Sequence, residues 1–303
     1  MKRLFTFIIC VFFSQELYAQ REVQYAQYLA NPLAINPAQA GAREVFHLNA
    51  IFRKQWVSGI QSLPTSQTFA MDGRLGDKSA EGYADRVGFI GLGLQGLLDR
   101  TGLTNNTAVS GNIAYHYKIA DNQTISFGVS GGINVLPIYD PTTRVSLNRA
   151  KGSVGVGINF DTESFWAGVS VPEILNQSYG GAANLGILQY SKPVFAQVGI
   201  KLVPEEGILI KPSILVSYNK GRPLGYDINL QGSYQQKLGA ALSYRQSTLT
   251  AFQKTNYFYG LLTYSIVPNI QVGYSYSSKV AEAYLNDRGI HELMFTFIPN
   301  PKN

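Results

Sequence analysis

The chain is built from segments in which apolar and polar side chains alternate for about ten residues at a time. In the segment from Tyr226 to Tyr234, Tyr, Ile, Leu and Gly occupy one set of alternate positions, and Asp, Asn, Gln and Ser occupy the other. Successive side chains of a strand point to opposite faces, so such a segment predicts a strand with one apolar face and one polar face.

Short and long connections between these segments alternate along the chain. Outer-membrane β-barrels have short turns on the periplasmic side and longer loops outside, and this rhythm is typical of them. The connection at 76–85 is longer than a periplasmic turn should be. The predicted short turns are 119–122, 161–162, 204–207, 235–236 and 267–268, and the predicted long loops are 137–152, 172–189, 219–224, 246–255 and 278–288.

The sequence predicts an all-β fold, an antiparallel transmembrane β-barrel of the outer-membrane type with about 14 strands. A soluble β-sandwich also alternates, but its strands cluster near 5–6 residues. Several segments here alternate for roughly 9–12 residues, as membrane strands do. The charged residues Lys201, Lys211 and Arg245 fall on polar faces, which are expected to line the lumen. The predicted strands begin near Val45, Ser66, Arg86, Asn105, Gln123, Ser153, Ser164, Lys192, Ile208, Tyr226, Lys237, Tyr257, Asn269 and Ile290.

The N-terminus predicts export. Lys2 and Arg3 precede an apolar run at 4–13, which is too short to span a bilayer as a helix. Cleavage after Ala19 would remove Cys10, the single cysteine, so disulfides and thiol chemistry are excluded from the mature chain. The predicted organisation is a signal peptide at 1–19, a periplasmic or plug segment at 20–44, a β-barrel at 45–298 and a short tail at 299–303.

No catalytic, cofactor-binding or metal-binding residues are predicted. Matches to nucleotide and nucleophile motifs at 91–96 and 128–132 lie inside strand-like runs, where the helix that each motif requires is missing. Small residues that ease barrel curvature are the expected reason for the glycines at 91–96. His47, His116 and His291 are far apart in the sequence, and the positive charges are scattered, so metal and nucleic-acid binding are not expected. An outer-membrane lipase with a strand-borne Ser and His stays an alternative.

The segment at 24–41 does not alternate and contains two Asn-Pro steps, at Asn31-Pro32 and Asn36-Pro37. A residue before proline avoids the helical region, so each step favours a turn. The segment is expected to leave the periplasmic mouth or to fold into it as a plug, and its Asn-Pro residues either turn the chain or contact a partner.

This pattern resembles the N-terminal signature of the PorP/SprF family of outer-membrane proteins, followed by an Arg-x-Gln-Trp strand and a last strand with His-Glu. Trp56 is expected to anchor the barrel at the membrane interface. The tail at 299–303, after the aromatic final strand, departs from the pattern. The residues that carry the resemblance, and that are candidates for partner contact, are Gln27, Tyr28, Asn31, Pro32, Asn36, Pro37, Gly41, Arg53, Gln55, Trp56, His291 and Glu292.

The resemblance implies a non-enzymatic component of the type IX secretion and gliding motility apparatus in the outer membrane of a Gram-negative cell. Its implied partners are outer-membrane lipid, periplasmic ring proteins of that apparatus and secreted surface adhesins, which it would dock or anchor. The alternative is an outer-membrane channel for small or hydrophobic solutes.

Overall fold

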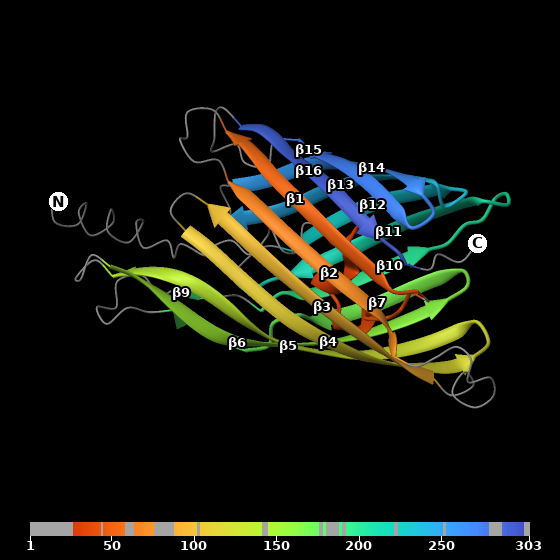
Figure 1. Ribbon diagram of the computed structural model, residues 1–303, viewed down its shortest axis with the longest axis horizontal. Helices are drawn as coiled ribbons and strands as arrows, with labels where there is room; N and C mark the ends of the chain where they lie inside the picture. Colours follow the sequence, from red (N-terminus) through yellow and green to blue (C-terminus); the bar gives the residue numbers. More distant parts are fainter. Residues whose placement is uncertain are drawn as a thin grey trace, which may run out of the picture.

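The structure is a computed structural model, and it describes residues 27–43, 45–57, 64–75, 88–101, 104–140, 145–175, 178–179, 188–189, 192–220, 224–250, 253–278 and 287–299. Fourteen strands form one closed antiparallel barrel, in which β16 pairs with β1 (Figure 1). The predicted fold class is confirmed. The predicted signal peptide and residues 300–303 lie outside the described residues.

The barrel strands follow one another in the sequence, except that the pair β8–β9 interrupts the order between β7 and β10. The small pair consists of β8 (Ser178–Tyr179) and β9 (Leu188–Gln189). The barrel strands are β1 (His47–Val57), β2 (Thr65–Leu75), β3 (Gly88–Thr101), β4 (Thr104–Ala120), β5 (Gln123–Asp140), β6 (Val145–Thr162), β7 (Phe165–Val171), β10 (Val194–Ile200), β11 (Ile208–Tyr218), β12 (Gly225–Tyr234), β13 (Leu238–Thr250), β14 (Gln253–Val267), β15 (Ile270–Ser277) and β16 (Asp287–Phe297).

The predicted short turns all lie at one end of the barrel, which we call the short-turn end. One of them has positive φ at both Gln235 and Gln236, and the N–H of Lys237 donates to the carbonyl of Tyr234 over 2.9 Å, so the chain reverses tightly with the twist of its strands. The chain enters β1 and leaves β16 at this end. We assign the short-turn end to the periplasm, because outer-membrane barrels place their short turns there.

Two predicted long loops are wrong in length. β5 and β6 pair as far as Asp140 and Val145, so most of 137–152 is strand, and β13 and β14 likewise pair through most of 246–255. Backbone N–H and C=O groups gain by pairing whatever side chains they carry, so a strand pair can continue past the end of the alternation. β5 and β6 extend past the neighbouring strands in Figure 1.

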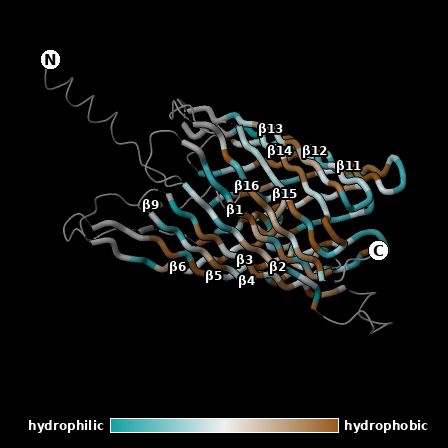
Figure 2. Tube along the Cα trace, turned by 45° about the horizontal axis from the view of Figure 1, so that its top comes forward, coloured by the Kyte–Doolittle hydropathy of each residue, from teal (hydrophilic) through white to brown (hydrophobic). Residues whose placement is uncertain are grey.

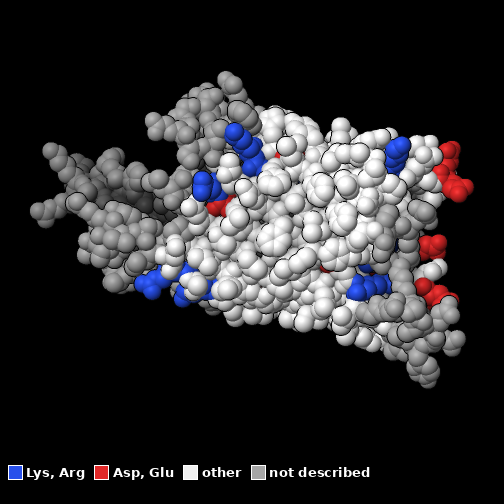
Figure 3. Space-filling view, viewed as in Figure 1, with Lys and Arg blue, Asp and Glu red and all other residues white. Residues whose placement is uncertain are grey.

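The faces of the strands follow the predicted alternation. On β12, Ile228 and Leu230 point outward and are each 51% exposed, whereas Asn229 between them is 3% exposed and faces the lumen. The exposed residues are the apolar ones along most strands. Brown and teal stretches succeed one another along the strands in Figure 2. On the face shown in Figure 3, charged side chains gather toward the two ends, and few lie in the belt between them. This belt suits the hydrocarbon region of a bilayer.

Residues 27–43 lie inside the barrel, where they are drawn in orange-red in Figure 1. We call this segment the plug. It contains two short 3-10 helices, η1 (Pro32–Ala34) and η2 (Pro37–Gln39). No helix in the described part of the chain is long and apolar enough to cross a membrane.

Candidate functional site

The two Asn-Pro steps of the plug start its two 3-10 helices. Each proline stands at the first helical position, where its fixed φ suits the helix and its missing N–H costs nothing. Asn36 caps η2, because its Oδ1 accepts a hydrogen bond of 2.9 Å from the backbone N–H of Ala38. The steps therefore fold the plug into a compact series of turns that fits within the lumen.

The outer end of the plug is held by Gln27, which is 2% exposed. Its Nε2 donates to Glu292 of β16 over 3.1 Å, and its Oε1 accepts from Thr68 of β2 over 2.7 Å. Glu292 also accepts from Ser275 at 2.6 Å and lies 3.9 Å from the guanidinium of Arg53. One side chain of the plug thus ties together the strands on both sides of the β1–β16 closure.

Tyr28 anchors the plug to β12. Its hydroxyl exchanges hydrogen bonds of 2.8 and 3.1 Å with the side chain of Asn229 on β12. The guanidinium of Arg245 lies 5.1 Å from the centre of the Tyr28 ring and 3.4 Å from Asp227. A cation over an aromatic face, together with its own carboxylate partner, fixes this ring in place.

The middle of the plug presents backbone carbonyls to the wall. Gln95 of β3 donates to the carbonyl of Leu33 over 3.2 Å, and Ser170 of β7 donates to that of Ile35 over 2.7 Å. Asn36 donates in return to the carbonyl of Ile158 on β6 over 3.2 Å. Buried backbone groups outside a ladder need such partners, and the polar lumen wall supplies them.

His116 and Asp72 hold the inner end of the plug. Nε2 of His116 lies 2.7 Å from the carbonyl oxygen of Ala40, which can only accept, so this nitrogen carries the proton. Its Nδ1 then accepts the hydrogen bond from Ser126, also at 2.7 Å. The backbone N–H of Gly41 donates to Asp72 over 3.0 Å. The Ser-His pair is therefore part of the plug anchoring.

Glycines on the inner wall let the plug backbone approach very closely. A Cβ on Gly128 would lie 2.2 Å from the nitrogen of Ala38, and one on Gly91 would lie 1.9 Å from the carbonyl oxygen of Ala40. Gly157 meets the Asn36 side chain in the same way, at 2.0 Å. These contacts are made by backbone or by a fixed amide, so no larger residue fits without moving the plug.

Barrel curvature, the reason expected for the glycines at 91–96, is therefore an incomplete explanation. Gly91 and Gly93 face the plug, and Gly96 faces outward, where a Cβ would lie 2.1 Å from the ring of Phe69 across the strand pair. The ring covers Gly96 on the lipid side, as aromatic residues do for cross-strand glycines. Ser130 lies on the lumen side of β5, as predicted for a polar-face residue, and is 7% exposed.

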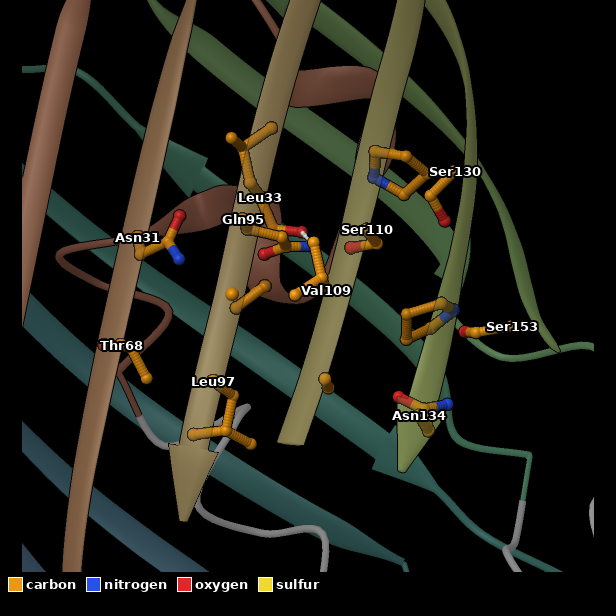
Figure 4. A pocket seen from close by; sticks show the side chains of 15 residues that line it. Asn31, Leu33, Thr68, Gln95, Leu97, Val109, Ser110, Ser130, Asn134 and Ser153 are labelled. Carbon is orange, nitrogen blue, oxygen red and sulfur yellow. Dashed lines mark hydrogen bonds between the residues drawn. The ribbon is translucent and has the colours of Figure 1, made fainter. Parts of the chain in front are cut away.

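Little space remains between the plug and strands β2 to β6. A cavity of about 30 Å³ lies there, beside Leu33, Gln95 and Ser130 (Figure 4). That volume has room for about one or two water molecules. Larger cavities, each of about 210 Å³, lie on the short-turn side of the plug.

The structure brings together nine of the twelve signature residues in and around the plug, namely Gln27, Tyr28, Asn31, Pro32, Asn36, Pro37, Gly41, Arg53 and Glu292. Gln55 and Trp56 belong to β1, and the Trp56 side chain lies outside the described residues, which leaves its anchor role a prediction. His291 is separate, because its Nδ1 lies 2.6 Å from the Tyr274 hydroxyl and both rings line a cavity on the outer face.

The wall residues that hold the plug were not among the candidates. They are Thr68, Asp72, Gln95, His116, Asn159, Ser170, Asn229 and Arg245, and each is a polar residue at an inward position of its strand. The alternation marks them as lumen-facing, but it does not separate them from polar residues that only meet water. The described residues contain no group of His, Cys, Asp or Glu that could hold a metal ion.

A sequence model of the type IX secretion system membrane protein PorP/SprF family matches residues 17–297. The chain belongs to this family. The PorP/SprF chain is accordingly an outer-membrane protein and a membrane component of type IX secretion. No curated protein sequence matches it.

Several solved outer-membrane barrels resemble the PorP/SprF chain in structure. The Acinetobacter baumannii outer membrane protein Omp33 is 11% identical, with 85% of this chain and 99% of that chain covered and a TM-score of 0.53. The CymD monoaromatic hydrocarbon channel is 9% identical, with 90% and 92% covered and a TM-score of 0.51. A Pseudomonas aeruginosa FadL homologue is 11% identical, with 88% and 93% covered and a TM-score of 0.50. At these identities the likeness concerns the fold alone.

Proposed function

We propose that the protein is a non-enzymatic docking or anchoring component of the type IX secretion and gliding motility apparatus. In this function the barrel is a fixed platform in the outer membrane. Periplasmic proteins of the apparatus bind at the short-turn end, and a secreted surface adhesin binds at the opposite end, where β5 and β6 project beyond the membrane.

The observation that carries this proposal is the filled lumen. The plug makes hydrogen bonds to β2, β3, β4, β6, β7, β12 and β16, which surround it. The plug therefore reaches strands all around the lumen, and a docking platform needs no open pore. The burial of Gln27, Tyr28 and Asn36 favours a structural role for these signature residues, and partner contact is proposed for the short-turn end of the barrel.

A lipase function has little support from the lumen chemistry. Ser126 and His116 are each 2% exposed, and the second ring nitrogen of His116 is engaged by the carbonyl of Ala40. An ester could reach this pair only after the plug had left. Purified protein in detergent is accordingly expected to hydrolyse no ester substrate.

Transport of small or hydrophobic solutes is the second candidate. CymD, which has a similar fold, is described as a monoaromatic hydrocarbon channel. Single-channel recording of the purified protein separates the two functions. We expect no stable open pore, whereas steady ungated currents from pure protein would favour transport and contradict docking.

Crosslinking in intact envelopes followed by purification tests the docking role directly. Periplasmic proteins of the secretion and motility apparatus should be recovered with the barrel. Deletion of residues 27–41 should leave a barrel that still migrates as a heat-modifiable band, but should open the lumen and abolish secretion or motility. Unchanged secretion and motility in that deletion would remove the plug from the proposed function.

A further inference from the structure

The space between the plug and the short-turn end holds two adjoining cavities, each with a mixed polar and apolar lining. One of about 210 Å³ includes Asp161, Lys201 and Lys211 in its lining. The other, also of about 210 Å³, includes Leu261 and Met294 in its lining. Leu29, Arg43, Lys211 and Gln231 line both, so the cavities meet at these four residues. We call the pair the vestibule.

The vestibule lies toward the short-turn mouth. Its lining includes His47, the first residue of β1, and Thr296, which immediately precedes the last residue of β16. On the other side, Asp161 immediately precedes the last residue of β6, and Lys201 follows the end of β10. The plug lies on the side of the vestibule that faces away from this mouth, so a ligand would enter the vestibule from the periplasm.

The cations of the vestibule are unequally matched by carboxylates. The ammonium of Lys201 lies 2.7 Å from Asp161 and donates to the carbonyl of Thr162 over 2.8 Å. Arg43 interacts electrostatically with Asp72 and lies against the ring of His47. Lys211 makes no hydrogen bond within the described residues, and it shares the field of Asp161 with Lys201, while Arg43 and Lys201 add their positive fields beside it.

The charges therefore leave room for one further carboxylate. Arg43, Lys201 and Lys211 are three cations, whereas Asp72 and Asp161 beside them are two carboxylates, so one positive charge is in excess around Lys211, which shares Asp161 with Lys201. A cation held partly out of water gains most from an anion that reaches it with a hydrogen bond. A phosphate dianion would bring a second charge close to Asp161, whereas a single carboxylate would balance Lys211 alone.

We propose that the vestibule binds an acidic peptide segment from the periplasm, with one carboxylate on Lys211 and an apolar side chain in the cavity beside Leu261 and Met294. Side chains two residues apart in an extended peptide point the same way and lie about 7 Å apart. One acidic and one apolar residue at that spacing would fill the two adjoining cavities. This inference rests on the proposed docking function, since it names the chemistry of the periplasmic partner.

A labelled peptide tests the site on the full-length protein in detergent. The probe is a fluorescein-labelled Gly/Ser peptide with one Glu and one Leu two residues apart, and its counterpart has Gln in place of Glu. Binding is measured by fluorescence anisotropy. We expect the Glu peptide to bind about tenfold more tightly than the Gln peptide, and to bind more weakly as salt is added.

Lys211→Gln should weaken binding of the Glu peptide about tenfold and leave binding of the Gln peptide unchanged. Lys237→Gln is the matched control, because Lys237 is an exposed lysine at the same end that lies over the ring of Tyr264, outside the vestibule. Ser213→Glu is a second test variant. Ser213 lines the same cavity as Lys211, and a glutamate there would pair with Lys211 in place of the carboxylate of the peptide. It should reduce binding of the Glu peptide as strongly.

Equal affinity of Lys211→Gln and the unsubstituted protein for the Glu peptide would overturn the proposal, as would an equal loss in Lys237→Gln. Glutarate is added as a competitor to test whether a free small acid binds in place of a peptide. Displacement of the peptide by glutarate at equal concentration would identify a small dicarboxylate as the ligand and would overturn the peptide assignment.

Recovery of periplasmic partners separates this inference from the docking function. Partners that crosslink equally to Lys211→Gln and to the unsubstituted barrel would sustain docking and reject the vestibule as the place where it occurs. Salt-sensitive peptide binding without recovery of any partner would sustain the site and reject the docking function.

Discussion

The two halves of the lumen wall hold the same plug in different ways. On the side of β2 to β7, glycines let the plug lie directly against the strand backbones, and the space left is a cavity of about 30 Å³. On the side of β11 to β16, long side chains such as Arg245 and Gln231 reach inward to the plug. That side borders both cavities of the vestibule, of about 210 Å³ each, and one of them also reaches the short-turn ends of β6 and β7 at Asp161 and Trp166.

The difference follows from where the plug lies within the barrel. A segment pressed against one wall needs small residues there, because backbone cannot move aside as a flexible side chain can. The opposite wall must then span a wider gap, which the long side chains of arginine, glutamine and lysine can do. We call the side of β2 to β7 the near half and the side of β11 to β16 the far half. The near half should therefore tolerate no added bulk against the plug, whereas the far half should tolerate it.

Gly128→Leu should have the largest effect, because it adds bulk to the near half. Overpacking costs about 1–3 kcal/mol even where neighbouring side chains can shift. Here the first contact would be the plug backbone, at 2.2 Å from the new Cβ. The plug should leave its seat, and single-channel recording should detect an open pore.

Gly131→Leu is the control for this substitution. Gly131 belongs to the same strand, but a Cβ there meets nothing within 4 Å. The lumen of this variant should stay closed. A closed lumen in Gly128→Leu as well would contradict the tight fit of plug and wall.

Ser213→Arg and Ile214→Arg test the far half and the lipid face together. Ser213 lines the charged cavity of the vestibule, so an arginine has room there and the barrel should assemble normally. Ile214 is 45% exposed on the outer face, where an arginine costs about 2–4 kcal/mol at mid-depth. The amount of heat-modifiable barrel in the outer membrane should fall sharply for Ile214→Arg alone, and equal amounts would count against the assignment of faces.

The strands could be predicted from the sequence and the seat of the plug could not, for a physical reason. Period-two alternation reports locally which side of a strand faces lipid, and it correctly placed Ile228, Asn229 and Lys211. The plug has no such period, and its contacts join residues as far apart as Gln27 and Glu292, which are separated by 265 positions.

The glycines illustrate the same limit. Gly91 and Gly128 stand in strand-like runs where curvature or chance motifs account for them equally well. Their role depends on what lies opposite in the lumen, which no local pattern records. Loop lengths failed for a related reason, since β5 and β6 keep pairing as far as Asp140 and Val145, beyond the run that the alternation marks.

Arg245→Ala should lower the stability of the far half of the barrel, by an amount between those of the substitutions above and below. Arg245 is 4% exposed, lies 3.4 Å from Asp227 and stacks over the rings of Tyr28 and Tyr259. Losing a hydrogen bond to a charged group costs about 2 kcal/mol. The temperature at which the band loses its folded migration should fall. Arg100→Ala, at an exposed hydrogen bond to Asn105, should leave that temperature unchanged.

Tyr28→Phe and Ser170→Ala compare single hydrogen bonds on the two halves and should have the smallest effects. Each substitution removes one hydroxyl that holds the plug, to Asn229 on the far side or to the carbonyl of Ile35 on the near side. A hydrogen bond of this kind contributes about 1 kcal/mol, which corresponds to roughly a fivefold change in the population of a displaced plug. Brief pore openings should become about fivefold more frequent in Tyr28→Phe. In Ser170→Ala the increase should be smaller, because the packed backbone of the near half still holds the plug, and a larger increase there than in Tyr28→Phe would reverse the comparison.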